Sequence, residues 1–191
     1  MKKRCAWCEV NDRMRAYHDK EWGVPVHNDR KLFEFMVLDA FQAGLSWSTI
    51  LNTRQNFKKA FDNFDPKKIA RYDKRKVARL LKDAGIIRNR QKIEATIKNA
   101  RAFLVIKKEF GTFDKFIWQF VGGKPRQNRF RTMRRIPPKT RQSDAMSKEL
   151  KKRGFSFVGS TICYAFMQAA GMVNDHVISC FRYPDIRKLC S

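Results

Sequence analysis

The sequence predicts an all-α protein. Apolar residues recur at helical spacing through most of the 191 residues, and residues that favour helix ends border these stretches. No stretch alternates apolar and polar residues convincingly enough to predict a β-strand. With 43% hydrophobic residues, the chain can bury the core of one domain. We expect residues 1–191 to form a single domain of two helical lobes that share a cleft.

Capping and breaking residues divide the chain into predicted helices. Four side chains stand where an oxygen atom can accept hydrogen bonds from the free amides of a first helical turn: Asp29, Asp65, Asp73 and Thr112. Proline at position 66 suits a first turn, and three glycines suit helix ends: Gly85, Gly111 and Gly154. In chain order the predicted helices cover residues 31–45, 66–72, 74–85, 90–111, 113–123, 143–154 and 161–171.

One segment, Lys124–Arg141, is predicted to be irregular. It contains three prolines, eight basic residues and no acidic residue. We interpret it as a loop of about 124–141 between an N-terminal and a C-terminal group of helices. It is either a mobile solvated linker or a segment that contacts phosphate groups.

The charge balance favours a polyanionic partner. Lysine and arginine number 42 against 18 acidic residues, which gives a net charge of +24. Such a charge attracts nucleic acid, with an affinity that falls as salt rises. The alternative is that the basic surface only aids solubility or touches anionic lipid. A membrane partner is not expected, because the longest uncharged stretch, 155–174, is interrupted by polar residues and no lipidation motif is present.

The cysteines favour a reducing compartment. Their number, five, is odd, and the first ten residues lack the apolar segment of a signal peptide. We therefore expect a cytoplasmic protein without disulfides. A monomer is also expected.

The two ends of the chain carry matching halves of a metal site. Cys5 and His18 lie near the N-terminus, and His176 and Cys180 lie near the C-terminus. The second pair is spaced i, i+4, which on a helix places both side chains on one face. Two thiolates and two imidazoles complete a tetrahedral set for zinc. The alternative is two satisfied core histidines and buried free thiols. The cysteines expected to be free are Cys8, Cys163 and Cys190.

Asp39 is the most conspicuous polar residue of the apolar helix 31–45. It follows Phe35 and Met36 by three or four residues, so it lies on an apolar stripe. A carboxylate there is costly unless it is hydrogen-bonded, neutral or required for function. The alternative is a structural carboxylate satisfied by a helix end or an arginine.

Aromatic residues gather in the first quarter of the chain. They are Trp7, Tyr17, Trp22 and Trp47. Flat bases bind by stacking on such rings, although ordinary core packing explains any single one of them. Trp118 lies far from this group and is expected in the core.

The segment Gly154–Thr161 joins two predicted helices and is similar to a helix-hairpin-helix element. Its glycines let backbone amides approach a phosphate, and the start of the next helix offers free N–H groups. Spacing alone does not separate it from other helical hairpins.

Several longer motifs together resemble the 3-methyladenine DNA glycosylase I family. They are AYHDKEWGVP at 16–25, QAGLSW at 42–47, DAGIIRNRQKI at 83–93 and KKRGFSFVGSTICYAFMQAAGMVNDH at 151–176. They occur in the family's order, and the similarity runs from about Cys5 to Tyr183 without a large insertion.

The resemblance implies a helix-hairpin-helix DNA glycosylase fold and a DNA repair enzyme. Its substrate would be double-stranded alkylated DNA, from which it flips out and hydrolytically excises N3-methyladenine, without a strand-cleaving lyase step. One structural zinc per chain would bind Cys5, His18, His176 and Cys180. The base-binding residues would be Trp7, Tyr17, Asp39 and Trp47, with Trp22 lining or supporting the pocket. The DNA-binding residues would be Gln42, Gly44, Leu45, Gly154, Phe155, Gly159, Ser160 and Thr161.

Two positions bear on the details of this resemblance. The family has glutamate where this chain has Asp39, so a base sits deeper here or is bridged by a water. Wider helix-hairpin-helix glycosylases carry a catalytic aspartate at the place where this chain has Asn174, which agrees with a family that lacks it.

Two other functions are consistent with parts of the sequence. A zinc-stabilised DNA-binding module would use the same basic face, but it has no need of a buried carboxylate ringed by aromatic residues. A zinc hydrolase or nuclease would keep one metal position open, whereas four protein ligands leave none.

Overall fold

The computed structural model describes residues 2–189 and is mostly helical. The elements are α1 (Asp12–Lys20), α2 (Asp29–Gln42), α3 (Trp47–Ala60), α4 (Pro66–Ile69), α5 (Lys74–Lys82), α6 (Arg90–Phe110), α7 (Phe113–Trp118), β1 (Arg126–Gln127), α8 (Arg141–Lys152), α9 (Ser160–Ala169), β2 (Val173–Asn174) and α10 (Arg182–Lys188). All seven predicted helices are present within a few residues, whereas α1, α3 and α10 were not assigned from the sequence. Among the described residues, none of these helices has the length and apolar character that a membrane span requires.

Side-chain caps explain where most of the helices begin. Three predicted caps are confirmed, since each accepts a hydrogen bond from a first-turn amide: Asp65, Asp73 and Thr112. The prediction for Asp29 is wrong by one residue, because the side-chain oxygen of Asn28 accepts from the Lys31 amide at 3.0 Å. Gly111 follows the end of α6 with φ +82°, a conformation that glycine adopts at little cost.

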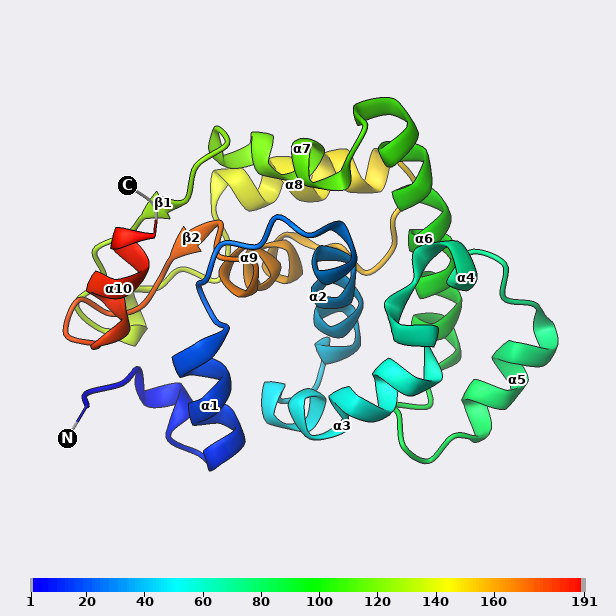
Figure 1. Cartoon of the computed structure of the whole chain (residues 1–191), viewed down its shortest axis with the longest axis horizontal. Helices are drawn as coiled ribbons and strands as arrows, with labels where there is room; N and C mark the ends of the chain where they lie inside the picture. The colour runs from blue at the N-terminus through cyan, green and yellow to red at the C-terminus, as the bar shows by residue number, and fades with distance from the viewer. Residues whose placement is uncertain (1, 190–191) are drawn as a thin grey trace.

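Helix α2 lies at the centre of the molecule (Figure 1). It packs against α3, α6, α7 and α9. Its buried residues are Leu32, Phe33, Phe35, Met36, Val37, Leu38, Asp39, Ala40 and Phe41. A helix that is apolar on nearly all sides must be covered by neighbours. A buried polar group on α2 is therefore either satisfied internally or faces a cavity.

The two ends of the chain lie on the same side of the molecule (Figure 1), where the Phe181 amide donates to the Lys3 carbonyl at 2.9 Å. β1 pairs in parallel with β2, and the Phe130 carbonyl accepts a hydrogen bond from the Ile178 amide at 2.9 Å. The expectation that the chain has no strand is therefore wrong at these four residues. These bonds attach part of the Lys124–Arg141 segment to the C-terminal segment, so that part is not a solvated linker.

Candidate functional site

The four predicted metal ligands converge although they come from opposite ends of the chain. Cys5, His18, His176 and Cys180 are all buried, and their ligand atoms lie within 4.8 Å of one another. Cys180 Sγ is 3.5 Å from His18 Nε2 and 3.6 Å from His176 Nδ1. Tetrahedral zinc with ordinary bond lengths places a sulfur and a nitrogen ligand about 3.6 Å apart. The donor set and its spacing therefore fit zinc.

The local route to this convergence differs from the expected one. The i, i+4 spacing would place His176 and Cys180 on one face of a helix, but residues 175–181 form bends and turns instead. The Cys180 amide donates to the Val177 carbonyl at 2.8 Å, and this turn brings the thiol back toward the imidazole.

Hydrogen bonds orient both histidines. His18 Nδ1 lies 2.8 Å from Asp19 Oδ1, and Arg4 donates to the same carboxylate at 2.8–3.1 Å. His176 Nε2 lies 3.1 Å from the Trp22 carbonyl oxygen. Partners of this kind fix the ring orientation and tautomer of metal-binding histidines. The remaining described cysteines, Cys8 and Cys163, are free, and Cys190 lies outside the described residues.

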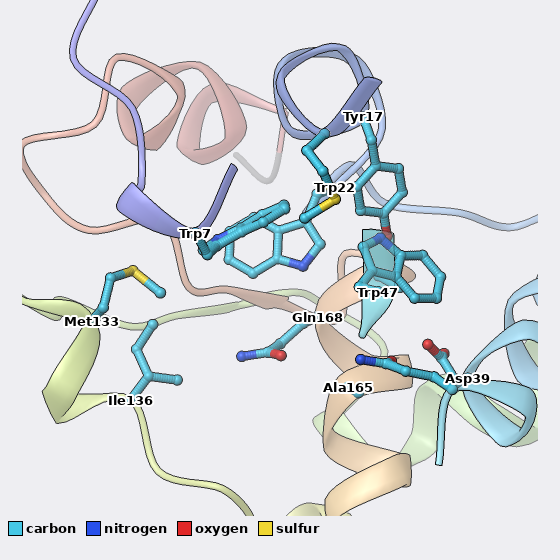
Figure 2. Close-up of a pocket in the computed structure, with 12 residues that line it drawn as sticks. Trp7, Tyr17, Trp22, Asp39, Trp47, Met133, Ile136, Ala165 and Gln168 are labelled. Carbon is cyan, nitrogen blue, oxygen red and sulfur yellow. The ribbon is translucent and has the colours of Figure 1, made fainter. Parts of the chain in front are cut away.

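A cavity of about 330 Å³ is shown in Figure 2. It lies beside the predicted ligands, because its lining residues Trp7 and Trp22 pack on His18 and His176. It is lined by Trp7, Met14, Tyr17, Trp22, Asp39, Gln42, Trp47, Met133, Ile136, Ala165, Gln168 and Ala169. The cavity volume is within the range of binding sites for small molecules, and the cavity has room for a purine. All five residues predicted to bind or support a base are in this lining.

Aromatic rings form much of the wall. Trp7 and Trp22 meet edge to face with centroids 5.1 Å apart, and Tyr17 and Trp47 lie 5.3 Å apart. Trp22 also packs edge to face on the His176 ring at 4.6 Å. The metal-ligand cluster therefore supports this wall from behind.

Two polar atoms in the cavity lack a hydrogen-bond partner in residues 2–189. They are Asp39 Oδ2 and Trp47 Nε1, both buried. Asp39 is only 2% exposed, and neither an arginine nor a helix end satisfies it. Burial holds the pKa of Asp39 well above its usual range and raises that of Tyr17, to which the Asp39 charge also contributes. An unpaired buried oxygen is costly, which indicates that a ligand completes it.

Several lining residues were missed from the sequence. Met133 and Ile136 belong to the basic segment, where apolar residues among arginines were the available signal. Gln168 is the one amide in the apolar stretch 162–173, and it donates to Asp175 at 2.8 Å. Asn174 lies in β2 and is not part of the lining.

The chain turns sharply between α2 and α3. The Leu45 amide donates to the Gln42 carbonyl at 2.6 Å, Ala43 has φ −47° and ψ 115°, and Gly44 has φ +79°. These angles are those of a type II turn, which favours glycine at its third position. Gln42 lines the cavity, while Leu45 is 41% exposed at the surface.

The hairpin segment Gly154–Thr161 joins α8 to α9. Gly154 has φ +88°, and amides of Gly154 and Phe155 donate to the Lys151 and Leu150 carbonyls in a Schellman motif. Ser156 exchanges two hydrogen bonds with the Asn99 side chain, at 2.8 and 3.0 Å.

The start of α9 leaves backbone donors available. Helices α1 to α8 each begin with a side chain that caps a first-turn amide, whereas Gly159 offers none to α9. A Cβ atom at Gly159 would meet nothing within 4 Å. The first amides of α9, which include those of Ser160 and Thr161, are therefore free to bind an anion that approaches over Gly159.

Comparison with known proteins supports the resemblance over nearly the whole chain. Residues 7–183 match the methyladenine glycosylase family. The DNA-3-methyladenine glycosylase 1 of Escherichia coli strain K12 is 51% identical over 182 residues, which are 95% of this chain and 97% of that protein.

Solved structures agree. A crystal structure of 3-methyladenine DNA glycosylase I superposes with a TM-score of 0.93 at 50% identity, over 95% of this chain and 100% of that one. A tyrosine-to-phenylalanine variant of 3-methyladenine DNA glycosylase I, solved in complex with 3-methyladenine, superposes at 0.92 with 32% identity, over 95% and 97%. The chain therefore belongs to the methyladenine glycosylase family and is a hydrolase of N-glycosidic bonds.

Proposed function

We propose that the protein flips N3-methyladenine out of alkylated double-stranded DNA and excises it by hydrolysis. The proposal rests above all on Asp39, a buried carboxylate whose Oδ2 has no hydrogen-bond partner among residues 2–189, in a cavity walled by aromatic rings. The relatives named for this activity, and the one solved with 3-methyladenine, support the same substrate.

The lesion makes modest demands on the catalyst. N3-methyladenine in DNA carries a positive charge, so it leaves as a neutral base and its glycosidic bond is already weak. The enzyme must extrude the nucleotide, select the cationic purine and stabilise the positive charge that develops on the sugar. Water then attacks the anomeric carbon. No lysine nucleophile is required, so we propose a monofunctional enzyme.

Each cavity residue has a proposed role. Trp47 stacks on the purine and attracts its charge through the ring face. Asp39 accepts a hydrogen bond from the base and, in its ionised form, balances the positive charge. Tyr17, whose pKa is raised by burial, stays neutral and adds a polar contact. Trp7 and Trp22 complete the wall.

DNA is held outside the cavity by three elements. The Gly154–Thr161 hairpin binds a phosphate through the free amides at the start of α9, and the exposed arginines of Lys124–Arg141 add non-specific affinity. Leu45, on its turn between α2 and α3, enters the duplex where the base has left. The hairpin contact is the helix-hairpin-helix part of this mode of binding.

The four ligands Cys5, His18, His176 and Cys180 hold one structural zinc. When bound, the metal cross-links the two ends of the chain and supplies no reactive group, because protein ligands fill all four positions. That arrangement disfavours a zinc hydrolase or nuclease.

The test is to incubate the protein with duplex DNA methylated at adenine N3 and to identify the released base. We expect free 3-methyladenine and an abasic site in an uncut strand. DNA binding without base release would instead support the DNA-binding module. Strand cleavage without added alkali would contradict the monofunctional mechanism.

A further inference from the structure

The position of Lys92 is unfavourable for a positively charged side chain. It is 7% exposed, and no acidic side chain of residues 2–189 pairs with it. It lies in the first turn of α6, where the positive end of the helix dipole repels a positive charge. Burial also lowers its pKa. Something on the other side of the ammonium group must offset these costs.

That partner is the end of α2. Lys92 Nζ donates to the Phe41 carbonyl at 2.8 Å and to the Ala43 carbonyl at 2.6 Å. The last carbonyls of a helix lack intrahelical partners and form the negative end of its dipole. Lys92 therefore caps α2 from a distant part of the chain, 49 and 51 residues further on.

The second bond acts on one particular peptide plane. The Ala43 carbonyl belongs to the central peptide of the type II turn Gln42–Leu45, between Ala43 and Gly44. Rotation of that plane by half a turn converts a type II into a type I turn, which changes ψ at the second position and φ at the third. The cation at 2.6 Å holds this carbonyl in the type II orientation.

The turn connects two parts of the proposed site. Asp39 stands in the last turn of α2 and Trp47 begins α3, and both line the cavity. Between them Leu45 projects to the surface. We propose that Lys92 is a positioning residue that locks the Gln42–Leu45 turn, so that Leu45 enters the duplex in register with the cavity; this rests on the proposed function.

The test compares Lys92→Met, Lys92→Arg and a matched control, Lys98→Met, an exposed lysine of the same helix. Three quantities are measured on folded protein: the single-turnover excision rate, the affinity for a duplex with a tetrahydrofuran abasic analogue, and the affinity for free 3-methyladenine. Because charge-assisted bonds to the turn are lost, we expect Lys92→Met to lower the first two about tenfold or more and to change free-base affinity less than about threefold.

The conservative variant and the control make the inference falsifiable. Lys92→Arg should recover most of the excision rate, and Lys98→Met should match the wild type. The inference would be contradicted if Lys92→Met lost excision rate and free-base affinity equally. It would also be contradicted if Lys92→Met excised the base at the wild-type rate. If Lys92→Met does not fold, Lys92→Gln, which keeps one neutral donor, should give the same split. A wild-type protein that releases no 3-methyladenine would refute the proposed function itself.

Discussion

At the scale of single residues, Asp39 carries the strongest functional signal because its burial has no structural explanation. Its Oδ2 has no partner in the described chain, and the cavity places it opposite aromatic rings (Figure 2). Burial of such a group without a partner destabilises the folded protein, so its presence indicates that a ligand binds to it.

We predict that Asp39→Asn folds but excises N3-methyladenine poorly. The loss of a charge-assisted hydrogen bond costs about 1.5–3 kcal/mol, or roughly tenfold to more than a hundredfold in binding or rate. Asp39→Glu should keep substantial activity, since it restores the residue expected in relatives, and Trp47→Ala should lose base affinity independently of duplex binding. Free-base affinity and excision rate of the three variants are the measurements. Wild-type excision by Asp39→Asn would make the carboxylate structural.

The raised pKa of Asp39 has a second consequence, for stability. Below about pH 4 the carboxyl is protonated in the folded and the unfolded chain. As pH rises, the unfolded chain ionises first while burial keeps the folded group protonated, so the unfolded state binds fewer protons and stability falls.

We therefore predict that Asp39→Asn gains stability relative to wild type as pH rises from about 4 toward neutrality. Each unit of pKa shift corresponds to about 1.4 kcal/mol, and the two proteins should converge at low pH. Thermal unfolding across this pH range measures the difference. A constant difference would mean that the folded carboxyl titrates normally.

The residues that sequence reasoning found and missed differ in kind. Asp39 contradicts the apolar pattern of its helix, so one stretch of sequence was enough to single it out. Met133 and Ile136 fit the interpretation of Lys124–Arg141 as a basic loop. They reach the cavity in a segment that the β1–β2 pairing and the Phe130–Ile178 hydrogen bond attach to the C-terminal segment. Lys92 looks like any lysine of an amphipathic helix, because its carbonyl partners lie 49 and 51 residues away.

At the scale of elements, the hairpin between α8 and α9 contains two glycines that differ in backbone conformation. Only Gly154 has a positive φ, which other residues adopt at a cost. Gly154 has φ +88°, so substitution there strains the backbone, whereas Gly159 has φ −63° and open space at its Cβ. Gly159 is thus the cleaner probe of function.

We predict that Gly159→Leu leaves thermal stability nearly unchanged but weakens duplex binding about tenfold or more, because the side chain blocks a phosphate from the α9 amides. Gly159→Ala should fall between it and the wild type. Duplex affinity measured against salt concentration is the readout, and a lower slope would indicate a lost phosphate contact. Unchanged affinity in Gly159→Leu would remove the hairpin from the DNA-binding surface.

Helix positions were predictable because caps and apolar spacing are local. Asp65, Asp73 and Thr112 each act within three residues of themselves. The missed β1–β2 ladder is a non-local pairing, because it joins segments about 47 residues apart. His176 and Cys180 lie in local bends and turns, which a search for helical spacing does not detect.

At the scale of the whole molecule, the proposed metal cross-links the N-terminal and C-terminal segments of the chain. Cys5 and His18 belong to the first elements and His176 and Cys180 to the last, while Trp22 packs against His176 and lines the cavity. A change at the ligands should therefore reach both the fold and the base pocket.

We predict one zinc per chain, and that Cys180→Ala loses it with a marked fall in unfolding temperature and in free-base affinity. A structural site contributes its binding energy to folding, and here it also supports the aromatic wall.

Cys163→Ala is the matched control, since that thiol is buried as well but donates to the Val158 carbonyl at 3.4 Å, away from the ligands. It should keep its zinc. Elemental analysis and thermal unfolding measure the first two effects, and hydrogen exchange should show early opening of α1 and residues 173–189. Gently purified, active protein without metal would refute the zinc assignment, because the buried cluster would then hold by its hydrogen bonds alone.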